Sequence, residues 1–151
     1  MAAGKQTSTD VPTVTPVSYT STVHGETFVS AEYVKEHSGQ VVIIDARGAN
    51  VCSGEVTEPW ATKPDHILTA VSLPAMLMWS EDGTYKPIQT IEQLVNAVIT
   101  AGKQDEVIVY CGERGWESSW RYVLTQMLGY TNVKLNDGTA QPWAAENDMV
   151  K

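Results

Sequence analysis

The sequence VIVYCGERGWESSWRYVLTQML, residues 107–128, determines the fold that we expect for this chain. Its first four residues are apolar, β-branched or aromatic, which is typical of a short strand buried in a parallel sheet. Apolar residues then recur at helical spacing over residues 116–127, and Gly129 follows as a helix stop. Cys111 therefore lies between a strand and a helix, at the carboxyl end of the strand, where parallel α/β folds carry their chemistry.

The turn after this strand predicts a reactive thiol. Amide N–H groups of residues 112–116 can point toward the Cys111 sulfur, and the N-terminus of a helix lies directly behind them. Both effects favour a thiolate, which is a nucleophile at neutral pH, and the same amides can hold an oxyanion. Arg114 is the only cation of the loop sequence. Glu113 and Glu117 are expected to face solvent, because carboxylates near the sulfur would oppose its negative charge.

The rest of the chain alternates short apolar segments with helical patterns and tight turns, as α/β domains do. Further strands are expected at residues 41–44, 66–73 and 133–135. Helical segments are expected at residues 31–37, from a capping box at 90–93 to Gly102, and as single turns at 75–79 and 142–146. Residues 49–65 are expected to form a long irregular segment beside the site. The pattern predicts a three-layer α/β domain with a mainly parallel sheet.

At 151 residues the chain has the length of one domain, large enough for a core without disulfide or metal support. Residues 1–22 are rich in Thr, Ser, Val and Pro and carry no helical period, so we expect a flexible tail followed by one domain at residues 23–151. No apolar segment is long enough for a transmembrane span, and the N-terminus shows no signal-peptide pattern. The compartment is left open between the cytoplasm and, for a chain whose signal peptide has been removed, the periplasm.

The charge and the cysteine content argue against several classes of function. A net charge of −8 disfavours nucleic acid as a partner, because no basic face can neutralise phosphates. It also requires that any anion site be built locally, from backbone amides and one arginine. Cys52 and Cys111 do not form a CxxC pair, and the three histidines lack metal-ligand spacing, so neither a metal nor an organic cofactor is expected.

Five segments of the chain carry a resemblance to a known family: VVIIDARG at 41–48, HILTAVSLP at 66–74, EDGTYKP at 81–87, VIVYCGERG at 107–115 and LGYTNVKLNDGTAQPW at 128–143. Their order and spacing resemble the rhodanese (thiosulfate sulfurtransferase) superfamily over residues 28–143. The second segment keeps the family's frame but lacks its usual Pro-Gly turn. The resemblance implies a single rhodanese-like domain, in which helices cover both faces of a central, mainly parallel sheet of about five strands.

The resemblance also implies a mechanism. The Cys111 thiolate attacks the outer sulfur of a donor such as thiosulfate, polysulfide or mercaptopyruvate, keeps that sulfur as a persulfide and passes it to cyanide, a thiol or a partner protein. By position, the substrate-binding loop comprises Gly112, Glu113, Arg114, Gly115, Trp116 and Glu117. Arg47 is a further substrate-binding candidate that braces this loop together with Asp45. We expect His66 to support the site through a hydrogen bond to the backbone.

The loop departs from the family pattern in its charges. Many family members have an arginine five residues after the cysteine, where this chain has Trp116, and its own arginine comes earlier, at Arg114. Glu113 and Glu117 would repel a dianion, which favours a neutral, carbon-bound or protein-bound sulfur donor over thiosulfate. The expected partners are a small sulfur-containing anion or a protein sulfur donor or acceptor, for a chain that is a monomer or a homodimer.

Two other functions stay open. Phosphatases and arsenate reductases of related fold use a longer loop whose arginine binds the oxyanion, and Glu117 occupies the place of that arginine here. A sulfur-carrier or interaction module with a protein partner is the other alternative, although inactive members of the superfamily typically lack the cysteine. Cys52 is a candidate resolving thiol for Cys111, because its segment follows the strand that ends at Asp45.

Overall fold

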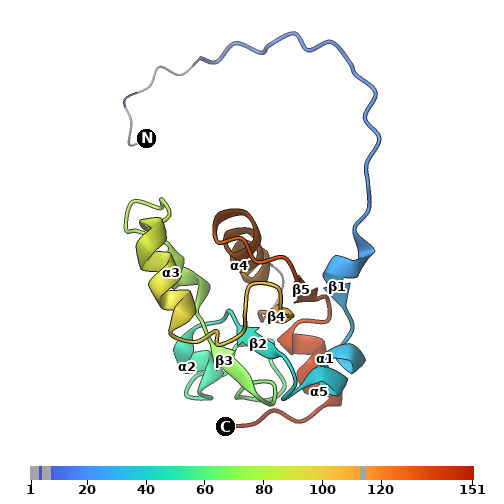
Figure 1. Ribbon diagram of the computed structural model, residues 1–151, viewed down its shortest axis with the longest axis vertical. Helices are drawn as coiled ribbons and strands as arrows, with labels where there is room; N and C mark the ends of the chain where they lie inside the picture. Colours follow the sequence, from blue (N-terminus) through green and yellow to red (C-terminus); the bar gives the residue numbers. More distant parts are fainter. Residues whose placement is uncertain (1–3, 5–7, 113–114) are drawn as a thin grey trace.

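The computed structural model describes residues 4, 8–112 and 115–151, and its centre is a sheet of five parallel strands in the order β1-β5-β4-β2-β3 (Figure 1). The strands are β1 (Phe28–Val29), β2 (Val42–Asp45), β3 (Ala70–Ser72), β4 (Val107–Tyr110) and β5 (Val133–Asn136). Each parallel connection crosses over through helical or irregular segments, so the carboxyl ends of the strands meet at one edge. This arrangement confirms the expected α/β fold.

Helices cover both faces of the sheet, which gives three layers. Figure 1 shows α3 and α4 on one side and α1 and α5 on the other, and two separate groups of buried side chains match these layers. The helices are α1 (Ala31–His37), α2 (Ala49–Cys52), α3 (Ile88–Asn96), α4 (Trp116–Tyr122) and α5 (Ala140–Glu146), with single turns η1 (Gly25–Thr27) and η2 (Ala75–Met78). A π-helical turn, η3 (Val123–Met127), continues α4.

The central strand β4 contributes side chains to both layers. Val107 and Val109 pack in the group that includes α3 and α4, whereas Ile108 and Tyr110 pack in the group that includes α1 and α5. All four side chains are fully buried. A strand covered on both faces needs apolar residues at every position, which is why its sequence does not alternate. Cys111, the next residue, returns to the α3 and α4 side.

Two helices match the sequence expectations to different degrees. Helix α1 spans residues 31–37 as expected, and the Ser30 hydroxyl caps it by accepting a hydrogen bond from Tyr33 N at 3.3 Å. The expected capping box at 90–93 is wrong. Helix α3 begins at Ile88, directly after Pro87, whose carbonyl accepts the Thr90 amide at 2.9 Å. A proline near a helix start already has helical φ, so it sets the helix N-terminus before Thr90 can.

Three other features also differ from the sequence expectations. The segment 49–65 is not irregular throughout, because α2 occupies its first four residues. Strand β3 contains only three residues, because Thr69 before it has a φ of 67° and the Ala70 amide turns back to the Ile67 carbonyl. Helix α3 ends at Asn96 rather than near Gly102.

Residues 8–22 contain no helix or strand, are exposed, and run away from the domain in Figure 1. The division into a flexible tail and a domain from residue 23 stays a prediction. Among the residues that the structure describes, no helix combines the length and the apolar character that a membrane crossing requires.

Candidate active site

Cys111 follows the central strand β4 at the carboxyl edge of the sheet, and its side chain is fully buried. Backbone hydrogen bonds fix the chain at Tyr110 and at Cys111 itself. The Tyr110 carbonyl accepts the Ala46 amide at 2.9 Å, and the Cys111 carbonyl accepts the Ala140 amide of α5 at 2.8 Å. The cysteine is therefore held between the end of β2 and the start of α5, as a strand-end residue of a parallel sheet should be.

The N-terminus of α4 supplies hydrogen-bond donors to the sulfur. The amides of Trp116 and Glu117 donate to Cys111, which favours its thiolate form. Gly115 precedes the helix with a φ of 140°, a conformation that residues with a Cβ rarely adopt. Glycine at this position lets the loop turn sharply enough for the first amides of α4 to face back to the strand end.

Glu117 points into the protein, so the expectation that it faces solvent is wrong. Its side chain is 7% exposed, and its Oε2 accepts the Gly115 amide at 2.9 Å. The carboxylate is also hydrogen-bonded to the Cys111 thiol. The physical reason is that the start of α4 has amides without intrahelical partners, and a carboxylate turned inward satisfies one of them.

These contacts determine the resting state of the thiol. Burial raises the pKa of Cys111 to about 12, the hydrogen bond and the charge of Glu117 act in the same direction, and the amides of Glu117 and Trp116 oppose them. The cysteine is therefore a protonated thiol at neutral pH, which differs from the thiolate that the loop sequence predicts. Desolvation and one nearby carboxylate outweigh two amide donors here.

Asp45, Arg47 and Tyr110 form a buried network beside the loop, on the other face of the sheet. Arg47 Nε and Nη2 donate to the Asp45 carboxylate, at 2.9 Å and 2.6 Å, and Nη2 also donates to the Asp65 carbonyl at 2.7 Å. Tyr110 Oη donates to Asp45 Oδ2 at 2.7 Å. Burial alone would lower the pKa of Arg47, but the hydrogen bonds and charge of Asp45 raise it. These contacts favour a bracing role for Arg47 over direct contact with a substrate.

Cys52 lies in the same network as Asp45. Its side chain is buried, and its thiol lies close enough to Asp45 and Ser72 for both to affect its pKa. Burial and the negative charge of Asp45 raise the pKa of Cys52 to about 11. Asp45, Ser72 and Tyr110 are aligned across neighbouring strands and share one face of the sheet, whereas Cys111 packs on the other. Neither of these two cysteines is in a disulfide, and their placement argues against a direct Cys52–Cys111 bond.

His66 directly follows the segment 49–65, which contains Cys52 near its start. Its Nδ1 is 2.8 Å from the Cys52 carbonyl oxygen, and its backbone pairs with Val150 near the C-terminus. The imidazole therefore bonds to backbone at the end of α2, and it supports the site only through that helix.

Glu58 is a site residue that the sequence analysis did not identify. Its carboxylate lies against the Cα of Gly112, where any Cβ would collide with it. Arg47 Nη1 lies 3.7 Å from Glu58 Oε2, so this carboxylate connects the loop to the Asp45 network. The only sequence signal for Glu58 was its place in the long segment 49–65. No local pattern indicates which residue of such a segment contacts the loop after β4.

The remaining loop residues have different surroundings. Trp116 is the first residue of α4 and is about half exposed, whereas Trp120 is fully buried and donates from Nε1 to the Leu73 carbonyl at 2.7 Å. Trp116 is thus available to contact a substrate or partner at the rim of the site. Glu113 and Arg114 lie outside the described residues, so their predicted roles in substrate binding stay predictions.

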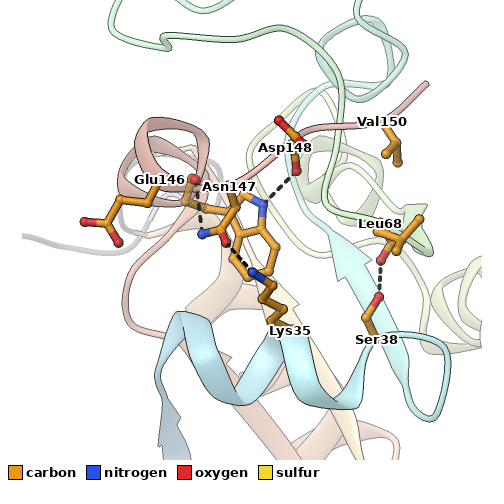
Figure 2. Close-up of a pocket in the computed structure, with 8 residues that line it drawn as sticks. Lys35, Ser38, Leu68, Glu146, Asn147, Asp148 and Val150 are labelled. Carbon is orange, nitrogen blue, oxygen red and sulfur yellow. Dashed lines mark hydrogen bonds between the residues drawn. The ribbon is translucent and has the colours of Figure 1, made fainter.

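A surface pocket of about 290 Å³ lies far from this chemistry (Figure 2). It is formed by α1 and the residue after it, by α5 and the residues that follow it, and by the segment before β3. Lys35 Nζ donates to Asn147 Oδ1 at 3.3 Å and Trp143 Nε1 donates to the Asp148 carbonyl at 3.2 Å. These elements meet where β2 and β3 begin, which is the edge opposite Cys111. Among the described residues, no group of His, Cys, Asp and Glu side chains gathers as a metal site would require.

The family model of the rhodanese-like domain matches residues 30–146, which is most of the chain. The chain belongs to the rhodanese-like family. A relative named "Putative thiosulfate sulfurtransferase" from Mycobacterium leprae is 35% identical over 118 residues, covering 72% of this chain and 40% of the relative. The sulfur carrier protein TtuD from Thermus thermophilus is 29% identical over 155 residues, covering 93% of this chain and 53% of that protein. The chain thus spans about half or less of the length of these relatives, whose names support rhodanese-type sulfur transfer at the level of the family.

Solved structures share the fold at low sequence identity. The anaerobic ergothioneine biosynthesis enzyme from Chlorobium limicola superposes with a TM-score of 0.70 at 19% identity, covering 84% of this chain and 33% of that one. The Tum1 protein from Saccharomyces cerevisiae superposes with a TM-score of 0.66 at 22% identity, covering 80% of this chain and 44% of that one.

Proposed function

We propose that the chain is a sulfurtransferase that carries sulfane sulfur as a persulfide on Cys111. The observation that supports this most directly is the cysteine itself. It lies at the carboxyl end of the central strand of a rhodanese-like domain, with its sulfur facing the first amides of α4. A nucleophile at this position has donors ready for the negative charge that forms on the sulfur during transfer.

The transfer takes two steps. In the first, the Cys111 sulfur attacks the outer sulfur of the donor, and the bond that held this sulfur breaks. The electron pair of that bond leaves with the rest of the donor, which also takes up the Cys111 thiol proton. The product is a Cys111 persulfide, whose terminal charge the amides of Trp116 and Glu117 are placed to stabilise. In the second step, a thiophilic acceptor attacks the terminal sulfur and the S–S bond electrons return to Cys111.

The candidate donors are thiosulfate, polysulfide and mercaptopyruvate, and the candidate acceptors are cyanide, a thiol and a protein. The relative named as a sulfur carrier protein supports a protein partner. The half-exposed Trp116 at the rim of the site gives such a partner an apolar contact beside the cysteine.

Glu117 disfavours the phosphatase or arsenate reductase alternative. The loop of those enzymes uses an arginine to bind the oxyanion, whereas this chain has a buried carboxylate in that place, hydrogen-bonded to the reacting sulfur. A phosphate or arsenate ion would meet charge repulsion there.

Intact-mass spectrometry after incubation with each donor tests the proposal. The wild-type protein is expected to gain one sulfur atom from at least one of thiosulfate, mercaptopyruvate and polysulfide. Cys111→Ser is expected to gain none, and Cys52→Ser, a matched change at the other buried thiol, is expected to load like the wild type. The proposal is wrong if no donor loads the folded wild-type protein.

A further inference from the structure

We propose that Glu117 makes the site selective for sulfur bound to an uncharged thiol, as in a hydropersulfide R–S–SH, and unfavourable for oxyanion donors such as thiosulfate. This inference rests on the sulfurtransferase function proposed above. It assigns Glu117 two roles: it repels anions at the reacting sulfur, and it carries a proton from Cys111 to the departing thiol.

The position of the carboxylate is fixed by its contacts. Glu117 is in the first turn of α4, is 7% exposed, and is held from one side by the Gly115 amide at 2.9 Å. From the other side it is hydrogen-bonded to the Cys111 thiol, so it touches the atom that reacts. A carboxylate in this place is screened little by solvent, unlike a glutamate on an exposed helix surface.

An anionic donor meets this carboxylate before and after the reaction. Thiosulfate brings two negative charges to the sulfur, and its transfer, in which the thiol proton passes to the departing group, leaves a persulfide anion and a bisulfite anion beside Glu117. Each of these states places like charges within a few ångströms of one another in a mostly buried site. The charge of Glu117 therefore opposes both the binding of thiosulfate and the transfer of its sulfur.

A hydropersulfide reacts at the same site without any change in charge. The Cys111 sulfur attacks the outer sulfur of R–S–SH while its own proton passes to the Glu117 carboxylate. The S–S bond of the donor breaks, and its electron pair leaves on R–S, which takes the proton from Glu117. The products are R–SH and Cys111–S–SH, and Glu117 is a carboxylate at the beginning and at the end.

Other charged groups surround this pair. Glu58 lies against Gly112, and Arg47 Nη1 is 3.7 Å from its Oε2. Asp45 binds the Arg47 guanidinium on the opposite face of the sheet. Glu113 and Arg114 belong to the same loop by sequence and lie outside the described residues. All of these groups are identical in the wild type and in a variant changed only at Glu117, so a comparison of the two isolates this carboxylate.

The test is a single-turnover comparison of two donors, thiosulfate and the hydropersulfide of 2-mercaptoethanol, with intact mass as the readout. The wild type is expected to load faster from the hydropersulfide. In Glu117→Gln, which keeps the size of the side chain, we expect the ratio of the hydropersulfide rate to the thiosulfate rate to fall at least about tenfold, as expected when one unit charge is removed beside the donor. Glu36→Gln, an exposed charge change on α1, is expected to leave the ratio unchanged.

The outcomes separate this inference from the proposed function. An unchanged ratio in a folded Glu117→Gln protein that loads from both donors overturns the selectivity role and leaves the sulfurtransferase function standing. If the variant does not fold, the wild type alone decides: equal or faster loading from thiosulfate overturns the inference. Failure of both donors to load the wild type contradicts the sulfurtransferase function itself.

Discussion

The two cysteines of this chain are alike in burial and in their raised pKa, and they differ in the hydrogen-bonding groups around them. Cys111 and Cys52 are both buried, neither is in a disulfide, both lie next to a carboxylate, and burial raises the pKa of both. Only Cys111 faces the first amides of a helix. The carboxylate beside Cys52 belongs to Asp45, which is occupied by Arg47, whereas the carboxylate beside Cys111 hydrogen-bonds to the thiol and one amide. The comparison indicates that the backbone donors of α4, rather than burial or a nearby acid, distinguish the proposed nucleophile Cys111 from Cys52.

The largest change is expected on the Cys52 side of the sheet, in Asp45→Asn. The substitution removes the closest charge partner of the buried Arg47 guanidinium, leaving the longer contact with Glu58, and weakens the bond to Tyr110 Oη. Removing one member of a buried ion pair typically costs about 3–5 kcal/mol of unfolding free energy, which urea unfolding would measure. Asp148→Asn breaks an exposed pair with Lys63 and is the matched control, expected to lose less than about 1 kcal/mol. Equal effects of the two changes would show that the network does not brace the site.

The second-largest loss of stability and of sulfur loading is expected from a change at the N-terminus of α4, beside Cys111. Gly115→Ala forces a residue with a Cβ into a φ of 140°, which costs about 1–3 kcal/mol and displaces the amides of α4 from the sulfur. We therefore expect lower unfolding free energy and slower sulfur loading. Gly25→Ala, at a glycine with open space around it and no positive φ, is the control. Loading at the wild-type rate in Gly115→Ala would contradict a role for the α4 amides.

The ionisation of the two thiols with rising pH gives a further way to distinguish Cys111 from Cys52. Both pKa values are raised, so both thiols stay protonated at pH 7 and become thiolates only as the pH rises toward about 11 for Cys52 and about 12 for Cys111. Glu117→Gln removes one cause of the Cys111 shift and is expected to increase its thiolate fraction at a given alkaline pH at least about tenfold. The absorbance of thiolate as a function of pH, measured in a Cys52→Ser background, reports this change. A Cys111 pKa that does not fall would show that Glu117 is not charged beside the sulfur.

The smallest effect is expected for the arginine of the loop. If Arg114 binds the donor anion, Arg114→Ala raises the KM for thiosulfate a few-fold with little change in kcat, because it removes binding that is equal in the ground and transition states. Steady-state kinetics with thiosulfate and cyanide measure both constants. An unchanged KM would place Arg114 outside the binding site.

The sequence was sufficient for the fold and for the position of Cys111 at the end of the central strand, because both depend on local patterns. The apolar residues 107–110 predict a buried strand, and a cysteine directly after such a strand lies at the functional edge of a parallel sheet. The start of α3 was misplaced for a local reason, since Pro87 competes with Thr90 as the helix start. Boundaries of this kind depend on which of two adjacent signals prevails.

The charges of the site could not be predicted in the same way. Whether Glu117 faces solvent or the sulfur depends on the free amide of Gly115 and the space beneath the loop, which are properties of the folded chain. Glu58 reaches Gly112 from a segment more than 50 residues earlier in the sequence, and no pattern along the chain links the two. The raised pKa of Cys111 follows from both burial and Glu117, so its direction also became known only with the structure.

The location of the transferred sulfur is the most direct test of Cys111 as the persulfide carrier. After loading with the most effective donor, the protein is alkylated, digested and analysed by peptide mass spectrometry, which compares the Cys111 peptide with the Cys52 peptide in the same sample. We expect one additional sulfur on Cys111 and none on Cys52. Sulfur on Cys52, or on both cysteines equally, would contradict the claim that the amides of α4 make Cys111 the sulfur carrier.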